Sequence, residues 1–183
     1  MTTAQSLPDT PDFANAEHKP AVAEYFTVGT IKFALMSLTT FGLYEAYWFY
    51  RNWKVIRDRE GSQIWPFWRG VFGVFWTFSL GKKLLIDAKE RSIAIELPAT
   101  KLGIVYFVVN SLYRLPGQYW LLSLLAFIAI LPFETAARRL NGNGGLSEPT
   151  SGTYSGWIIA WLIFGSLFLL LAIVGSFIPE SAT

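Results

Sequence analysis

The stretch TTFGLYEAYWFYRNW, residues 39–53, decides most of what this chain can be. Tyrosine, tryptophan and phenylalanine crowd together here, as they do in the aromatic belts at the two surfaces of a bilayer. One carboxylate, Glu45, stands inside the apolar run, and a basic segment begins at Arg51. The stretch therefore predicts a protein that lives in a membrane, and it specifies no reaction.

The composition supports the same class. Of 183 residues, 52% are hydrophobic and only 15% are charged, against roughly 25% in soluble domains. The chain has no cysteine, which excludes disulfides, cysteine zinc sites and thiol catalysis, and its one histidine, His18, excludes a histidine-rich metal site. A net charge of +2 gives no argument for nucleic acid. We therefore expect no metal, no cofactor and no nucleic-acid partner.

Apolar segments divide the chain after a polar tail. Residues 1–24 contain three prolines and no apolar periodicity, and they lack the basic start and apolar core of a secretory signal peptide. We expect a disordered N-terminal tail, one helical membrane domain over residues 25–179 and a short tail over residues 180–183. The apolar segments of the membrane domain cover residues 31–50, 64–80, 98–115, 118–134 and 154–178.

These segments fit a bilayer unequally. Residues 154–178 contain no charge, and the segment is long enough to span a bilayer with tilt. Residues 31–50 would form about 30 Å of helix, the thickness of the hydrocarbon core. Two threonines and Gly42 lie near their middle, so a kink, a local break or a partly re-entrant helix stays open. Residues 98–134 predict a helical hairpin.

The position of residues 64–80 decides between four and five transmembrane helices. It is aromatic but short, and it contains Arg69. An arginine at the bilayer centre costs about 2.5–3.5 kcal/mol on the insertion scale. Residues 82–96 follow as an amphipathic helix with Leu84 and Ala88 on its apolar face, suited to a membrane surface or a partner. We predict that residues 64–80 lie at the cytoplasmic interface or enter it only partway.

The positions of Lys and Arg favour four transmembrane helices over five, because cytoplasmic loops collect basic residues. With four spans and the N-terminus outside, twelve of the 15 basic residues lie inside, leaving out Lys19, Lys32 and Arg114. Five spans with the N-terminus inside divide them nine to six. The predicted fold is an all-α, multi-pass protein of the bacterial inner membrane, with four or alternatively five transmembrane helices plus interfacial amphipathic helices.

The aromatic block belongs to a longer pattern. Its centre is T-F-G-L-Y-E-x-Y-W-F-Y-x-N-W at residues 40–53, and further matches are Tyr25-Phe26-x-Val28, Lys32-Phe33, Met36-Ser37, Pro66-Phe-Trp-Arg69, Arg114-Leu-Pro116, Tyr119-Trp-Leu121 and Leu131-Pro132. In these residues the chain resembles a family of uncharacterised small bacterial inner-membrane proteins, a domain of unknown function. It lacks the acidic residue that the family pattern has near Gly117 and Gln118. The resemblance implies an integral membrane protein with several helices, and it transfers no ligand or catalytic residue.

Polar residues inside the apolar segments are the first candidate site. Intramembrane carboxylates often serve proton or ion pathways. Glu45 shares a helix face with Asn52, and we group both with Asn110 and Glu134 as a candidate polar seam. The alternatives are that Glu45 lies near the interface or pairs with a basic residue or a backbone group, and that Asn110 hydrogen-bonds to a neighbouring helix.

Basic and aromatic residues beside the apolar segments are the second candidate site. Arginine, lysine and tryptophan together suit the phosphate and glycerol layer of a bilayer. The alternative is that the basic residues only set the topology or act as snorkelling anchors. The candidate contacts with lipid headgroups are Arg51, Trp53, Lys54, Trp68, Arg69, Lys82 and Lys83.

No catalytic motif accompanies these residues. The chain contains neither a phosphate-binding Gly-x-x-x-x-Gly-Lys-Ser/Thr loop nor a Gly-x-Ser-x-Gly elbow. We expect a non-enzymatic interaction or assembly protein whose partners are membrane lipids, another membrane protein or a second copy of itself. The alternative is a small oligomeric transporter or channel with Glu45 in its pathway. A membrane-embedded enzyme acting on lipid is the third hypothesis.

Overall fold

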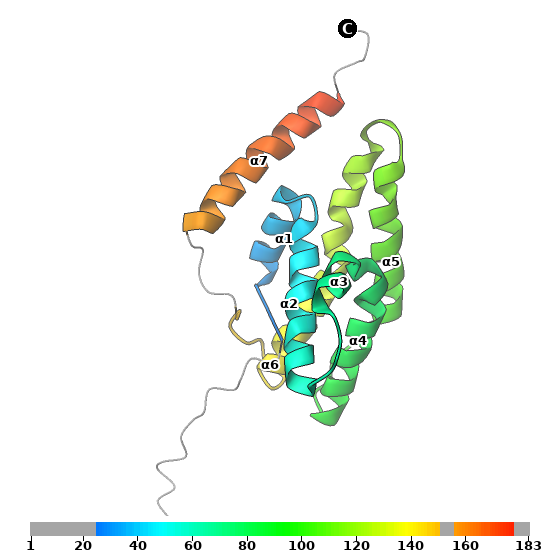
Figure 1. The fold of residues 1–183 in the computed structure, drawn as a ribbon, viewed down its shortest axis with the longest axis vertical. Coiled ribbons are helices and arrows are strands. Elements are labelled where there is room, and N and C mark those ends of the chain that lie inside the picture. The colour runs from blue at the N-terminus through cyan, green and yellow to red at the C-terminus, as the bar shows by residue number, and fades with distance from the viewer. Residues whose placement is uncertain (1–24, 151–155, 178–183) are drawn as a thin grey trace, which may run out of the picture.

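The computed structural model describes residues 25–150 and 156–177, and it is built of helices (Figure 1). The tails expected at residues 1–24 and 180–183 lie outside the described residues. Within the described ranges no strand occurs, only an isolated bridge between Gly142 and Gly145, so the all-α prediction is confirmed. The elements are α1 (Thr30–Thr39), α2 (Leu43–Glu60), α3 (Pro66–Val71), α4 (Gly73–Glu90), α5 (Ala99–Ser111), η2 (Leu112–Arg114), η3 (Gly117–Ala129), α6 (Leu131–Asn141) and α7 (Gly156–Ser176).

Two helices among the described residues are long and apolar enough to cross a membrane. One is the continuous rod of η3 and α6, Gly117–Asn141, and the other is Ile158–Ser176 within α7. This test uses length and composition only. Four or five transmembrane helices therefore stay a prediction.

The aromatic block folds into a helical hairpin instead of one helix. The backbone turns at Phe41 and Gly42, whose φ angles of 53° and 82° lie in the left-handed region. The Thr40 hydroxyl accepts from the Tyr44 amide at 3.0 Å, which replaces a backbone bond lost at the turn. As a result the ring of Phe33 on α1 meets Trp48 on α2 at 5.8 Å. The prediction of a single helix over residues 31–50 is wrong, and the local break was the correct alternative.

Residues 64–80 are also broken. The short helix α3 ends at Val71, and α4 begins at Gly73 and continues without interruption to Glu90. The expected boundary between residues 64–80 and an amphipathic helix over residues 82–96 is therefore wrong. The apolar face of α4 also differs from its expected surface role, because Leu84 and Ala88 are buried in the protein core.

Glycines allow α3 and α4 to lie directly on the hairpin. A Cβ at Gly70 would stand 2.7 Å from the Cβ of Tyr50, and one at Gly73 would stand 2.6 Å from the Phe49 ring. These distances are shorter than any normal contact, so only glycine fits. The aromatic residues of α3 consequently project from the side of α2.

The second hairpin stands beside the first. Helix α5 and η3 run in opposite directions, in the place of the hairpin expected over residues 98–134, and Gly117 with a φ of 66° completes the turn between them. Gly103 on α5 packs against the ring of Phe78 on α4. Helix α6 then continues past the core to Asn141.

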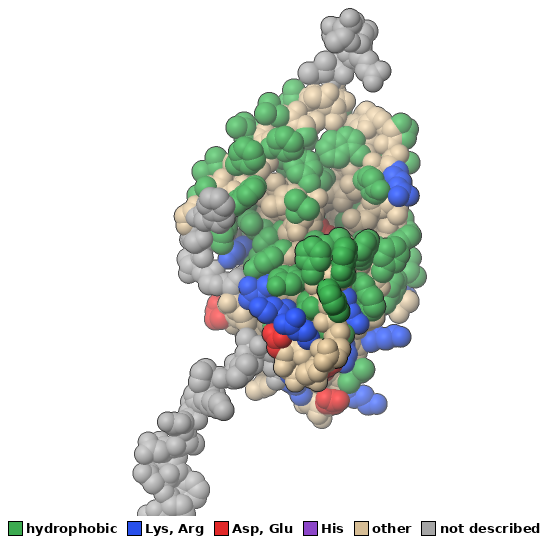
Figure 2. Space-filling view, viewed as in Figure 1, with side chains coloured by type: hydrophobic (Ala, Val, Ile, Leu, Met, Phe, Trp, Pro, Cys, Tyr) green, Lys and Arg blue, Asp and Glu red, His purple; other side chains and the backbone are tan. Residues whose placement is uncertain are grey.

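The side chains divide the molecule into an apolar end and a charged end. Figure 2 shows hydrophobic side chains over the upper part, around α7 and the α5–η3 hairpin, and Lys, Arg, Asp and Glu lower down. At the charged end, Lys83 on α4 pairs with Glu60 on α2 at 2.8 Å. Arg114 lies apart, in the turn between α5 and η3.

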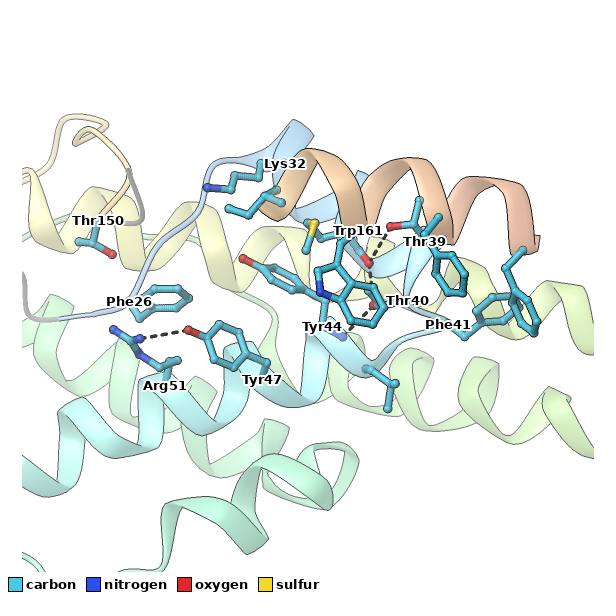
Figure 3. A pocket seen from close by; sticks show the side chains of 16 residues that line it. Phe26, Lys32, Thr39, Thr40, Phe41, Tyr44, Tyr47, Arg51, Thr150 and Trp161 are labelled. Carbon is cyan, nitrogen blue, oxygen red and sulfur yellow. Dashed lines mark hydrogen bonds between the residues drawn. The ribbon is translucent and has the colours of Figure 1, made fainter. Parts of the chain in front are cut away.

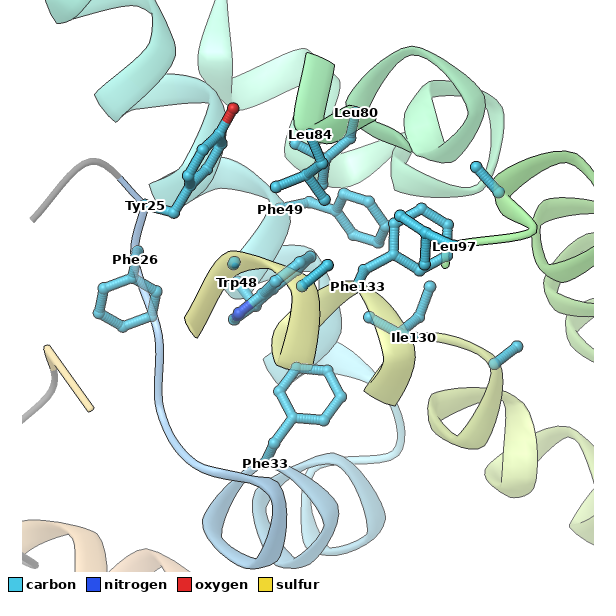
Figure 4. Close-up of a cluster of buried hydrophobic side chains, with 14 of the residues drawn as sticks. Tyr25, Phe26, Phe33, Trp48, Phe49, Leu80, Leu84, Leu97, Ile130 and Phe133 are labelled. Atoms are coloured by element: carbon cyan, nitrogen blue, oxygen red, sulfur yellow. The ribbon is translucent and has the colours of Figure 1, made fainter. Parts of the chain in front are cut away.

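The core lies where α1, α2, α4 and α6 meet (Figure 4). Trp48 and Phe49 on α2, Phe33 on α1 and Phe133 on α6 are all completely buried. Burying one side chain of this size stabilises a fold by about 1.5–3 kcal/mol. The quoted aromatic stretch thus supplies the centre of the core as well as an exposed surface.

Candidate functional site

An extended segment, residues 25–29, crosses the core at the charged end; we call it the strap. It belongs to no helix or strand, so its backbone needs other hydrogen-bond partners. Asn52 on α2 accepts from the Phe26 amide and donates to the Phe26 carbonyl, both at 3.1 Å. Asn141 on α6 makes the same pair with Tyr25, at 3.0 and 2.8 Å. Two asparagine side chains thus act like the neighbouring strand of a sheet.

Glu134 on α6 holds the other end of the strap. One of its carboxylate oxygens accepts from the amides of Val28 at 2.7 Å and Gly29 at 2.9 Å. The other oxygen accepts from the Nε1 of Trp48 at 2.7 Å. The side chain is fully buried, so these donors replace the water that a carboxylate requires. Glu134 therefore holds the strap in place, which favours a structural role over a place in an ion pathway.

A third group ties the strap to the charged surface. The Tyr25 hydroxyl donates to Asp87 on α4 at 2.6 Å, and Arg59 on α2 lies 2.8 Å from the same carboxylate. Burial and the bond to Asp87 raise the pKa of Tyr25 above its usual range. Burial alone would lower the pKa of Arg59, but Tyr25 and Asp87 outweigh it and raise that pKa. At neutral pH Tyr25 therefore keeps its proton and Arg59 keeps its charge.

The candidate polar seam does not form one continuous face. Asn52 and Glu134 meet at the strap, whereas Glu45 interacts with the side chain of Tyr106 on α5. Asn110, one turn further along α5, donates to the Tyr106 carbonyl at 3.0 Å. Glu45 is only 3% exposed. The structure thus brings the four candidates together as two pairs, and it pairs Glu45 with a tyrosine instead of a basic residue.

The candidate headgroup residues also separate. Trp53 is buried, and the guanidinium of Arg69 stands between the rings of Trp53 at 4.3 Å and Trp76 at 4.1 Å. Trp53 is therefore a core residue, which corrects its assignment to a headgroup contact. Trp68 is exposed and stacks with Phe72 on the outer side of α3.

The lysines among these candidates have two environments. Lys54 and Lys82 are exposed on α2 and α4. Lys83 instead forms its ion pair with Glu60, so its charge is neutralised within the protein. Arg51 lies at the edge of a cavity, described next.

A cavity with a volume of about 890 Å³ lies between α1, α2 and α7 (Figure 3). Lys32, Arg51 and Thr150 stand at one end, and Phe41 at the other. Sequence reasoning selected Arg51 and missed the cavity, because no local pattern tells where α7 packs. One signal was available: Gly165, the small residue of α7 that meets the backbone of Thr39. The remaining lining residues are Phe26, Met36, Thr39, Thr40, Leu43, Tyr44, Tyr47, Ile158, Trp161, Phe164, Gly165 and Phe168.

No cluster of three or more metal-ligating side chains occurs within residues 25–150 and 156–177. The chain matches no protein-family model, no curated protein and no solved structure in the comparisons made. The resemblance to a family of small inner-membrane proteins therefore stays a prediction, and function must be argued from the geometry.

Proposed function

We propose that this protein is a non-enzymatic, multi-pass membrane protein, of the bacterial inner membrane, that binds anionic lipid at its basic end. The observation that carries the proposal is the division of the molecule into two ends. Large apolar side chains stand exposed on every element of the upper part, far beyond the patches usual on soluble monomers. Examples with more than half of their surface exposed are Ile31, Phe67, Phe75, Ile104, Val108, Ile128 and Leu171.

The basic end sets the orientation that we propose for the protein in the membrane. Cations cluster on the lower turns of α2 and α4 and on the end of α6, where Arg138 and Arg139 lie. Cytoplasmic surfaces collect such residues, and anionic lipid attracts each of them by about 1 kcal/mol. Because Tyr25 contacts Asp87 at this same end, the strap also belongs on the cytoplasmic side. This differs from the four-span prediction, in which the chain entered from outside.

In the proposed topology, α1–α2 and α3 enter the membrane from the cytoplasmic side and return to it. The α5–η3 hairpin crosses and comes back, and α7 crosses last. The turn that contains Arg114 then faces the opposite side. The re-entrant hairpin is compatible with lipid because its turn satisfies its backbone groups internally.

Cysteine labelling tests this topology, since the native chain contains no cysteine. Single cysteines at Ser62 and Lys89 should react with a membrane-impermeant reagent only from the cytoplasmic side. A cysteine at the exposed Gln118 should react only from the other side. Labelling of Ser62 and Lys89 from opposite sides would contradict the proposal.

Lipid recovery tests the functional part. Purified protein should carry more phosphatidylglycerol than the membrane from which it was extracted, and exchanging the exposed Lys54 and Lys82 for glutamine should reduce the excess. A matched variant, Thr100→Gln, changes an exposed residue without changing charge. Recovery at the bulk lipid ratio by the parent protein would refute lipid binding.

A second candidate, an oligomeric transporter or channel, is favoured by one observation. Glu45 is a buried carboxylate in the apolar part of the molecule, and it interacts with the side chain of Tyr106. Ion or proton flux through proteoliposomes that falls in Glu45→Gln would support this candidate. Absence of flux in the parent protein would remove it.

A further inference from the structure

The cavity between α1, α2 and α7 has two chemically different ends. Figure 3 shows Arg51, Tyr47, Thr150 and Lys32 toward the start of α7, and Phe41 at the opposite end. Trp161 lies between them. About 890 Å³ is within the range of sites that enclose small ligands, roughly 300–1,000 Å³. Such an amphipathic cavity suits a molecule with one polar and one apolar end.

Arg51 is held in position by an aromatic ring and a tyrosine hydroxyl. Its guanidinium lies 4.5 Å from the centre of the Phe26 ring and donates to the Tyr47 hydroxyl at 3.0 Å. Among the described residues no carboxylate forms an ion pair with it. A guanidinium presents five N–H donors in a planar fork that matches phosphate. Lys32 lines the same end and adds a second cation.

The apolar end suits a hydrocarbon chain. Leu43 on α2 and Phe164 and Phe168 on α7 line it, and Gly165 brings α7 against Thr39. From residue 158 to residue 168 the helix rises about 15 Å, which sets the length of the groove. An acyl chain of that length would replace contacts with bulk lipid by contacts with aromatic rings.

We propose that this groove binds one anionic phospholipid, with its phosphate at Arg51 and Lys32 and one acyl chain between α2 and α7. The inference rests on the proposed function, because the basic end must lie at the level of lipid headgroups. Charge complementarity selects the occupant: the guanidinium of Arg51 at one end favours an anion, and the apolar lining beyond it favours hydrocarbon. Inorganic phosphate would bind only at the polar end of the groove, and a zwitterionic lipid carries its own cation, which would compete with Arg51 for the phosphate.

Native mass spectrometry of the full-length protein in detergent tests the stoichiometry. The parent should retain one phosphatidylglycerol at activation energies that remove phosphatidylcholine. Arg51→Gln should weaken retention at least tenfold, whereas Arg114→Gln, which removes an exposed arginine in the turn between α5 and η3 and outside the groove, should not. Equal retention of the two lipids, or an unchanged Arg51→Gln, would overturn the proposal. Displacement of the bound lipid by inorganic phosphate alone would reduce the groove to an anion site and also overturn it.

Photocrosslinking tests the position of the chain and does not depend on any variant folding. Phosphatidylglycerol with a photoreactive group in its acyl chain should label α2 near Leu43 and α7 near Phe168 in the parent protein. Labelling spread evenly over exposed helices such as α5 would overturn the groove. If phosphatidylglycerol were still enriched around the protein in that case, the proposed function would stand while this inference failed.

Discussion

The two helices that are long and apolar enough to cross a membrane differ in how much of each is buried within the protein. In the most apolar stretch of Gly117–Asn141, 44% of the residues are buried within the protein, against 6% in Ile158–Ser176. The first helix carries Glu134 and Asn141, which hold the strap. The second touches the body chiefly along one line, where Gly165 meets Thr39. Apolar composition alone therefore does not distinguish a helix of the core from a helix whose side chains are mostly exposed.

The difference has a physical origin. In lipid, an apolar side chain gains little by moving from hydrocarbon to a neighbouring helix, so association depends on small residues and polar contacts. α7 docks through Gly165, which meets Thr39, and through the ring of Phe168, which meets Phe41. The Gly117–Asn141 rod leaves the apolar end and enters the charged end, where hydrogen bonds specify its neighbours. Substitutions of buried residues in the Gly117–Asn141 rod should therefore lower the free energy of unfolding strongly. Substitutions on the outer face of α7 should change it little.

The largest effect is expected at Glu134. Glu134→Ala leaves the amides of Val28 and Gly29 and the indole of Trp48 without their acceptor. An unsatisfied buried donor costs about 1–3 kcal/mol, so we expect a loss of about 3 kcal/mol or more in the free energy of unfolding. Thermal unfolding in detergent measures it, with the exposed Glu148→Ala as the control. Equal midpoints for both variants would show that the strap is not held as described.

The next effect concerns docking of α7. Gly165→Leu places a side chain against the Thr39 carbonyl and should separate α7 from α1, at a cost of about 1–3 kcal/mol for overpacking. The body should keep its unfolding temperature, while cleavage of α7 by limited proteolysis should become faster. Gly175→Leu is the matched control, because no atom lies within 4 Å of its Cβ position. Identical cleavage rates for the two variants would contradict the contact.

Tyr25→Phe should have a smaller and pH-dependent effect. It removes the bond to Asp87, worth about 1 kcal/mol near neutral pH. Because the folded state raises the pKa of Tyr25, the contribution is fully present below the unfolded value, about 10, and is lost as pH rises beyond it. The stability difference between parent and variant should therefore shrink above pH about 10. Tyr119→Phe, at an exposed residue, should give no difference at any pH.

The smallest effect is expected on the outer face of α7. Leu171 is 59% exposed, so Leu171→Ala should change the free energy of unfolding by less than about 0.5 kcal/mol. The same truncation at the fully buried Ile130 should cost about 2–5 kcal/mol. Chemical denaturation of both variants in mixed micelles measures the two losses in the free energy of unfolding. Comparable losses would mean that α7 is packed against protein on this face as well.

Local patterns in the sequence determined the helical class, the apolar character of α7 and the helical pairing of residues 98–134. These properties depend on composition and on turn residues such as Gly117, which act within a few positions of the chain. The sequence also marked Glu134, Asn52 and Arg51 as unusual, because polar residues in or beside apolar segments need partners.

Only the tertiary structure decided which partners those are. Glu134 accepts from Val28 across 106 positions, and Asn52 bonds to Phe26 across 26, neither of which any periodicity shows. The reversal at residues 40–42 likewise depends on two left-handed residues stabilised by the packing of α1 on α2. Hydrophobicity is a property of each residue, and hydrogen-bond partners are properties of the whole fold. For this reason the sequence specified the helical class and the apolar segments, while the structure alone specified the strap and the groove beside α7.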